Sequence, residues 1–428
     1  MRLSDIAEIN PATDVSRLGP TDPVSFIPMS DVSDDGRWLG GDARPLCSVR
    51  NGYTCFAEGD VLFAKITPCM ENGKGCRAAG LINGVGFGST EFHVLRARSD
   101  ADAGYLYQWT KSRELRKRAA NSMVGSAGQQ RVPADFLRDY PIGTHSTREQ
   151  SAIARVLDCL DRAIEQTEAV VAKQERIKAG LLHDLLTRGL DADGRLRDPA
   201  THRFKPSPLG PIPEEWKVTP LEAMRREDRP FIKTGPFGTA IKQSDWVETG
   251  VPVITIGSLG PGRILRSGLQ FLREEKALEL ASYRVEEGDI LFSRVADVGR
   301  CILVSSSEAG WIMSSNLMRI SLDPAKAVPS FAHLALLGER TAEQTRRSVN
   351  AGGRDVVNTA ILLSLVFAWP PRGEQDRIIL TCKSHDSAVW DAEAGLAKFR
   401  RLKAGLMHDL LTGRVPVAPL LEGAHRCH

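Results

Sequence analysis

The chain has 428 residues, of which 42% are hydrophobic and 25% are charged, so it has the composition of a globular protein with room for two or three domains. A formal net charge of +3 does not by itself indicate nucleic-acid binding, which would need local clusters of cations. The N-terminus carries charges where a signal peptide needs an apolar run, and the longest apolar run, residues 360–369, is half a membrane span. We therefore expect a cytoplasmic protein with no membrane association.

The cysteines show neither C-x-x-C pairs nor a histidine at zinc-finger spacing, so the pattern indicates no metal site. We expect all eight to be reduced and structural: Cys47, Cys55, Cys69, Cys76, Cys159, Cys301, Cys382 and Cys427.

Residues 1–145 combine short β-like runs with glycine-rich turns and form the first predicted globular domain. Strands are expected at residues 24–28, 60–65 and 92–95, and a helix at residues 105–120. Five cations fall in eight residues of that helix, and they form either a solvated face or a face that follows DNA phosphates. These cations are Lys111, Arg113, Arg116, Lys117 and Arg118.

A long helix is predicted over residues 146–188, because a stripe with alternating steps of four and three residues runs along it. The stripe consists of Ile153, Leu157, Leu160, Ile164, Thr167, Val171, Gln174, Lys178, Leu181 and Leu185. The following residues, 189–215, are rich in proline and have no periodicity, so we expect a linker or extended connector there.

The second half of the chain repeats the plan of the first. RIKAGLLHDLLT at residues 176–187 returns as RLKAGLMHDLLT 225 residues later, and EGDVLFAK at residues 58–65 returns as EGDILFSR at residues 287–294. We expect a second globular domain at residues 216–370, a second long helix at residues 371–413 and a tail at residues 414–428. The second stripe is Ile378, Cys382, His385, Val389, Ala392, Leu396, Phe399, Lys403, Leu406 and Leu410.

The two stripes predict a long two-helix coiled coil, although ordinary amphipathic core helices are the alternative. A parallel pair in register would place Lys178 opposite Lys403, where like charges repel. An antiparallel pair would instead place Lys178 near His385 and Lys403 near Leu160, and we favour it. The expected fold class is α+β, with two globular domains of mixed helix and strand, an antiparallel coiled coil and an internal pseudo-twofold repeat.

The sequence contains no P-loop, G-x-S-x-G elbow, H-E-x-x-H helix or dinucleotide fingerprint. The repeated pairs His183-Asp184 and His408-Asp409 lie beside the leucine stripes, which indicates packing or partner contact rather than catalysis. We therefore expect a protein that is not an enzyme.

Single cations lie beside small residues at matching places in the two halves. Small residues let a backbone approach a phosphate closely, and arginine forks can recognise guanine edges. Each cation alone could equally be an ordinary surface charge. The candidate DNA-binding residues are Lys65, Lys74, Arg77, Lys111, Arg116, Arg131, Lys242, Arg294 and Arg354.

Taken together, these features resemble the specificity subunit of a type I restriction–modification system. The resemblance covers essentially the whole chain, and it rests on the combination of several stretches rather than on any one. These are KAGLLHDLLT and KAGLMHDLLT, LGPIPEEW, EGDVLFAK and EGDILFSR, ITPCMENGKG, GSTEFHVLR and GPFGTAIK.

The resemblance implies two target recognition domains, each reading one half of a bipartite double-stranded DNA target. The long helices would form a spacer that docks two copies of a methyltransferase subunit and, through them, a motor–nuclease restriction subunit. S-adenosylmethionine would bind to the methyltransferase, and this chain would hold no cofactor or metal. Two alternatives are a coiled-coil scaffold whose globular ends bind proteins rather than DNA, and an enzyme that uses an unfamiliar site. The expected coiled-coil and partner residues are Leu157, Leu160, Ile164, Val171, Leu181, Leu185, Val389, Leu396, Phe399, Leu406 and Leu410.

Overall fold

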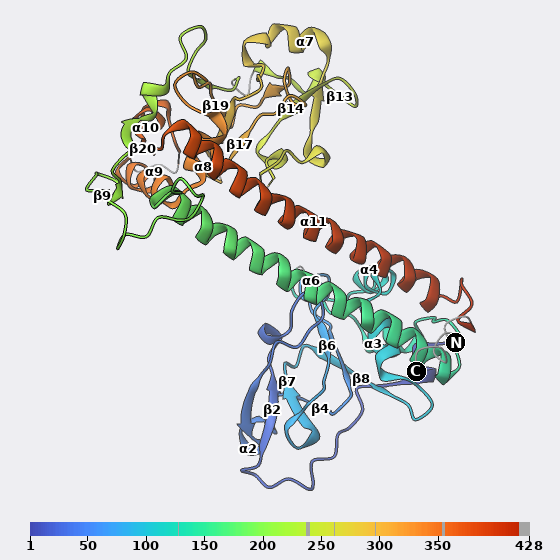
Figure 1. Ribbon diagram of the computed structural model, residues 1–428. Helices are drawn as coiled ribbons and strands as arrows, with labels where there is room; N and C mark the ends of the chain where they lie inside the picture. Colours follow the sequence, from blue (N-terminus) through green and yellow to red (C-terminus); the bar gives the residue numbers. More distant parts are fainter. Residues whose placement is uncertain (127, 237–239, 261, 296, 353–355, 419–428) are drawn as a thin grey trace. The chain divides into compact units, whose positions relative to one another are not determined.

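The structure, a computed structural model, describes residues 1–428 except 127, 237–239, 261, 296, 353–355 and 419–428. The chain divides into two compact units. Unit 1 comprises residues 1–169 and 393–428, and unit 2 comprises residues 170–392. Each unit therefore combines one globular half of the chain with parts of two long helices, α6 (Thr147–Thr187) and α11 (Arg372–Leu411) (Figure 1).

Two four-stranded sheets form the globular part of unit 1. The first sheet is antiparallel, in the order β1 (Ala7–Ile9), β8 (Phe92–Ala97), β5 (Val61–Ala64) and β6 (Gly75–Arg77). The second has the order β3 (Asp42–Pro45), β2 (Pro23–Ile27), β7 (Val85–Gly88) and β4 (Thr54–Ala57), and its β2–β7 pair is parallel. The strands expected at residues 24–28, 60–65 and 92–95 correspond to β2, β5 and β8.

The helix expected at residues 105–120 is instead two helices, α3 (Ala103–Lys111) and α4 (Arg113–Asn121). Ser112 separates them with an extended backbone, ψ 126°. The change of direction lets α3 bury Tyr105 and Trp109 while α4 buries Leu115 and Ala119 in the same core. The prediction of one helix was wrong because the charged residues and the helix propensity continue on both sides of Ser112, so nothing in the sequence marks a break there. The short helices of this part are α1 (Leu3–Ile6), α2 (Leu46–Val49) and α5 (Ala134–Asp139).

Unit 2 repeats the first sheet of unit 1 in the same order, with β12 (Ile232–Thr234), β19 (Leu317–Ile320), β16 (Ile290–Ser293) and β17 (Cys301–Leu303). Its second sheet has the order β13 (Trp246–Val247), β15 (Gln270–Leu272), β14 (Val251–Ile254) and β18 (Ile312–Met313). The parallel β14–β18 pair corresponds to β2–β7, but the fourth strand is added at the opposite edge. A pair of strands, β11 (Lys217–Pro220) and β20 (Val366–Trp369), and four helices complete the unit: α7 (Glu274–Glu279), α8 (Pro329–Leu337), α9 (Glu339–Gly352) and α10 (Thr359–Ser364).

The repeated E-G-D sequence forms the turn that leads into the central strand of each first sheet. Gly59 and Gly288 both have φ +85°, a backbone conformation that glycine adopts without strain. The buried carboxylate of Asp60 accepts the Ala57 N–H at 2.8 Å, and that of Asp289 accepts the Glu286 N–H at 2.8 Å. The motif is therefore explained by the fold, because it closes the same turn in both units.

Helices α6 and α11 run antiparallel to each other within each unit, as the sequence predicted (Figure 1). In unit 1 Lys403 of α11 forms an ion pair with Asp161 of α6, and in unit 2 Lys178 of α6 forms one with Asp386 of α11. The expected neighbours, Leu160 and His385, are each one residue away in the sequence. All twenty positions of the two stripes are buried or half-buried, and this agrees with a helix pair packed along a heptad seam.

The connector at residues 189–215 is extended but packs on the core of unit 2. Gly189 follows the end of α6 by two residues; its φ is +67° and a Cβ atom there would lie 2.2 Å from Glu374 Oε1, so only glycine fits. The buried Glu374 carboxylate accepts the Leu190 N–H at 2.8 Å, Arg197 Nη2 at 3.0 Å and Trp216 Nε1 at 3.1 Å. These bonds fasten both ends of the connector, which also contains strands β9 (Phe204–Lys205) and β10 (Ile212–Pro213).

Two further features concern the helices and the tail. Among the described residues, no helix has both the length and the apolar character that a membrane crossing needs. Val417 of the tail is buried beside Leu410 and Leu411, so this tail residue is part of the core of unit 1.

Candidate nucleic-acid and partner interfaces

The predicted DNA-binding cations lie in different environments. Arg77 and Lys242 are exposed, Lys65, Lys74, Lys111, Arg131 and Arg294 are half-buried, and Arg116 is buried. Arg354 lies outside the described residues.

Lys65 and Arg294 occupy equivalent positions at the ends of the two repeated strands. The Lys65 N–H donates to Glu91 O at 2.9 Å, and the Lys65 carbonyl accepts the Val132 N–H at 2.9 Å. The Arg294 N–H donates to Asn316 O at 3.2 Å, and its carbonyl accepts the Val357 N–H at 3.0 Å. The same backbone bonds therefore hold a cation at the same place in each unit.

Side chains around this place differ between the units. In unit 1 Arg131 donates to both oxygens of Glu91, at 2.8 and 2.9 Å, and this hydrogen bonding lowers the pKa of Glu91, with a smaller contribution from Lys65. The fold thus brings Lys65, Glu91 and Arg131 together, with one net positive charge. In unit 2 the backbone partner of Arg294 is the uncharged Asn316. The backbone at this place is therefore the same in both units, whereas the side chains around it differ.

Three other predicted cations have contacts inside the protein. Arg116 donates to the carbonyls of Thr110 at 2.8 Å, Met70 at 2.6 Å and Lys74 at 3.3 Å, and burial lowers its pKa to about 10. The Lys74 ammonium donates to Met29 O at 3.0 Å, and the Lys111 ammonium lies 3.3 Å from Asp161 Oδ1. These contacts favour structural roles for Arg116, Lys74 and Lys111 over the predicted DNA contacts.

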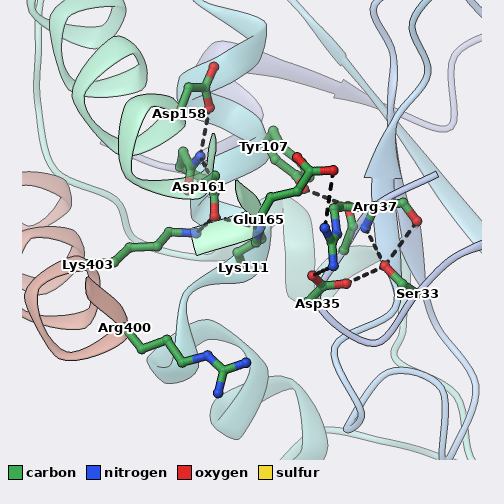
Figure 2. A network of polar contacts seen from close by, with 12 residues as sticks. Ser33, Asp35, Arg37, Tyr107, Lys111, Asp158, Asp161, Glu165, Arg400 and Lys403 are labelled. Atoms are coloured by element: carbon green, nitrogen blue, oxygen red, sulfur yellow. Dashed lines mark hydrogen bonds and ion pairs between the residues drawn. The ribbon is translucent and has the colours of Figure 1, made fainter. Parts of the chain in front are cut away.

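Lys111 belongs to a polar network beside a cleft of about 1240 Å³ in unit 1, lined by residues of α3, α4, α6 and α11 (Figure 2). Asp161 of α6 forms ion pairs with both Lys111 and Lys403, and it accepts a hydrogen bond from Gln108 Nε2 at 3.0 Å. Burial, together with the charge of Lys111, lowers the pKa of Lys403 to about 8. Although burial opposes it, the two ammonium groups lower the pKa of Asp161. The carboxylate therefore stays charged and binds two lysines from different elements.

A second contact of this network involves the turn at residues 33–37, closed by the Ser33 N–H donating to Arg37 O at 2.9 Å. The turn packs on α3, because the Tyr107 hydroxyl donates to Gly36 O at 2.6 Å. Arg37 lies 3.3 Å from Glu165 Oε1 and 3.2 Å from Glu168 Oε2 on α6, as Figure 2 shows in part. Arg400 of α11 donates to the other Glu168 oxygen at 2.8 Å.

Unit 2 has a corresponding turn with different chemistry. The Arg263 guanidinium stacks over the ring of Trp390 on α11 at 5.5 Å, and Trp390 is the repeat equivalent of Glu165. His333 of α8 is buried near Asp386 and Lys178, where it bonds to Cys301 O at 3.3 Å. Burial lowers the pKa of His333 to about 4, so it is neutral at pH 7.

The outer face of the helices presents an apolar residue twice at the same position of the repeat. Ile177 of α6 is 42% exposed, and Leu402 of α11, its equivalent 225 residues later, is 47% exposed. Leu181 and Leu406, which the sequence assigned to the seam, are half-buried against the cores of their own units. The seam pattern did not reveal Ile177 and Leu402, although their recurrence in the repeated stretch was a usable signal.

Comparison with known proteins finds relatives of one kind. The chain is 44% identical over 154 residues to the EcoAI specificity subunit of a type I restriction enzyme from Escherichia coli, which covers 35% of this chain and 26% of the relative. It is 23% identical over 318 residues to the MjaVIII specificity subunit from Methanocaldococcus jannaschii, which covers 72% and 70%. This chain is similar to type I specificity subunits. The resemblance inferred from the sequence is thereby confirmed.

The extent of the similarity differs between sequence and structure. The aligned segments span only 26% of the EcoAI subunit and 28% of the EcoEI subunit, to which the chain is 39% identical over 170 residues. No family model matches the chain. A type I S subunit from M. genitalium has a TM-score of 0.56 at 12% identity, covering 96% of this chain and 95% of that one. A chain from a study of type I complex assembly has a TM-score of 0.52 at 15% identity, covering 96% of each. The α+β fold with long helices is thus the fold of specificity subunits.

Proposed function

We propose that this chain is the DNA sequence-specificity subunit of a type I restriction–modification complex and recognises a bipartite double-stranded target. The observation that carries the proposal is the duplicated architecture. The first sheet has the same strand order in both units, and in each unit one lysine–aspartate ion pair links α6 with α11. Such duplication supports two related readers, residues 1–145 and 216–370, with different side chains on a common frame. The similarity of the chain to specificity subunits supports DNA as the ligand.

The proposed DNA contacts centre on Lys65 and Arg294, which have the same backbone geometry in the two units. Arg131 and Arg77 in unit 1 and Lys242 in unit 2 are further candidates, because their side chains are exposed or half-buried. Cations at such positions supply phosphate affinity, whereas base recognition depends on neighbouring side chains that differ between the units.

The proposed partner surface is the outer face of α6 and α11, with Ile177 and Leu402 at its two equivalent positions. Two equivalent apolar positions fit two copies of a methyltransferase subunit. That subunit would hold S-adenosylmethionine and carry out the methylation, and a restriction subunit would join through it. This chain would then supply specificity and positioning without catalysis.

Footprinting of the chain with its methyltransferase partner on the methylated target tests this proposal. We expect weak binding by the isolated chain, and two protected half-sites separated by an unprotected spacer once the partner is bound. A single contiguous protected half-site would contradict the two-reader proposal. Loss of all DNA binding by the assembled complex would favour a protein-binding scaffold.

A further inference from the structure

Asp161 of α6 binds two other elements of unit 1 at the same time. It binds Lys111 from the end of α3 and Lys403 from α11 (Figure 2). The side chains of Lys111 and Lys403 are only 15% and 10% exposed, so solvent screens these charges weakly. One carboxylate therefore joins the globular part to both long helices.

Glu168 makes the same kind of contact one heptad further along α6. It binds Arg37 from the turn at residues 33–37 through one oxygen and Arg400 from α11 through the other, at 3.2 and 2.8 Å. Seven residues of helix separate the two carboxylates by about 10 Å along one face. Two contacts at that separation restrict rotation as well as translation of the globular part on the helices.

We infer that Asp161 and Glu168 are positioning residues that make the orientation of the first recognition domain depend on the pairing of α6 with α11. If either carboxylate is neutralised, a cation of the globular part and a cation of α11 face each other without the charge between them. The expected effect is mutual repulsion rather than the loss of one surface ion pair. The recognition surface itself would remain intact while its angle to the spacer became variable.

Unit 2 supplies a matched control. Asp386 is the repeat equivalent of Asp161, and its one ion pair among the described residues is with Lys178 of the other long helix. The turn in unit 2 contacts α11 through Arg263 and Trp390, a stacking contact that does not involve Asp386. Asp386→Asn therefore removes a contact between the helices without removing one to the recognition domain of unit 1.

The first test measures distances in the full chain without DNA. Cys47 on α2 and Cys159 on α6 are both exposed in unit 1 and accept spin labels, after Cys55, Cys69 and Cys427 are replaced by serine. Burial raises the pKa of Cys76, Cys301 and Cys382 to between about 11 and 12, so these thiols do not compete for label. The original chain should give one narrow distance distribution.

We expect Asp161→Asn with Glu168→Gln to broaden that distribution about twofold or more, because both restraints on the domain are lost. Asp386→Asn should leave it unchanged. If the double variant unfolds, Glu168→Gln alone replaces it, since the Glu168 side chain is 25% exposed and its removal leaves the Asp161 contact in place. An unchanged distribution in a folded variant would overturn the inference.

The second test rests on the proposed function and follows methylation by the assembled complex. Targets with the natural spacer are compared with targets whose spacer is one base pair longer or shorter. The measured quantity is the ratio of the methylation rate on the natural spacer to the rate on an altered spacer. We expect this ratio to fall about tenfold in the double variant, because a misplacement of about 1 Å is enough to alter rates by that much. Unchanged discrimination would contradict the positioning role. If the original complex showed no target-dependent methylation, the proposed function would be wrong. The distance measurement would still test whether Asp161 and Glu168 fix the orientation of the domain, because it uses the chain without DNA.

Discussion

Lys403 and Asp161 form an ion pair, and we expect replacement of Asp161 to destabilise the protein more than replacement of Lys403. Asp161 keeps Lys111 and Gln108 when Lys403 is removed, whereas neutralising Asp161 removes the carboxylate that both Lys111 and Lys403 bind. Because burial lowers the pKa of Lys403 to about 8, holding its charge at pH 7 is already unfavourable.

We expect Lys403→Met to change the free energy of unfolding at pH 7 by less than about 1 kcal/mol, since an apolar chain of similar volume replaces a buried charge. Asp161→Asn should lower it by about 2 kcal/mol, because two ammonium groups then share a site with no carboxylate. Urea unfolding of the full chain measures both. Equal losses for the two variants would contradict this account.

His333 makes the free energy of unfolding of unit 2 depend on pH. Its pKa in the folded protein is about 4, below the ordinary value of 6.5, because burial disfavours the imidazolium. The unfolded chain therefore binds the proton more readily, and the stability that neutral His333 contributes is present above pH 6.5 and lost as the pH falls toward 4. The full effect is about 3 kcal/mol, from 1.36 kcal/mol per pKa unit.

We expect the free energy of unfolding to fall more steeply between pH 6.5 and 4.5 in the original chain than in His333→Gln. Glutamine keeps a hydrogen-bond donor for the Cys301 carbonyl but does not titrate. Parallel pH profiles for the two proteins would show that His333 is not responsible.

At the scale of elements, the two long helices carry buried or half-buried seam positions and, beside them, exposed apolar positions. The seam faces carry the stripes and the pairs Asp161–Lys403 and Lys178–Asp386, which stand at equivalent positions of the repeat. The outer faces carry Ile177 and Leu402. If Ile177 and Leu402 contact a partner as we propose, substitutions at these two positions should weaken assembly without unfolding the chain.

We expect Ile177→Asp with Leu402→Asp to abolish co-elution with the methyltransferase partner on a sizing column, because a charge would have to be buried in an apolar contact. The free energy of unfolding of the chain alone should stay within about 0.5 kcal/mol of its original value, as for other surface substitutions. Leu181→Asp and Leu406→Asp serve as the contrasting pair, since their side chains pack on the cores and should destabilise the chain. An intact complex with the Ile177 and Leu402 variants would refute this docking surface.

At the scale of the whole molecule, the repeated strand ends place one cation in each unit. If Lys65 and Arg294 each contact one phosphate, replacing both with glutamine and methionine respectively should weaken binding by the assembled complex. The slope of log affinity against log salt should fall by about 0.9 per contact. Fluorescence anisotropy over a series of salt concentrations measures both quantities. An unchanged affinity and slope would leave Lys65 and Arg294 with a structural role only.

Much of this fold could be predicted from local and periodic features. The stripes predicted two long helices, and the opposition of Lys178 and Lys403 predicted their antiparallel direction. The E-G-D repeat marked the central strand of each first sheet, because a glycine with positive φ and a capping carboxylate recur at a fixed spacing. Such signals lie within a few residues of one another or follow a helical period, so they can be recognised in the sequence without knowledge of the packing.

Which of the predicted cations are held by contacts inside the protein was decided only by the tertiary structure. Lys111 and Arg116 stand in a basic stretch of the sequence and Lys74 stands between two glycines, yet all three bind internal carbonyls or a carboxylate. The contact between Lys403 and Asp161 joins residues 242 positions apart, and no local pattern records it. A charge is drawn to whichever opposite charge or carbonyl the folded chain brings near it, so its role depends on neighbours that are distant in the sequence.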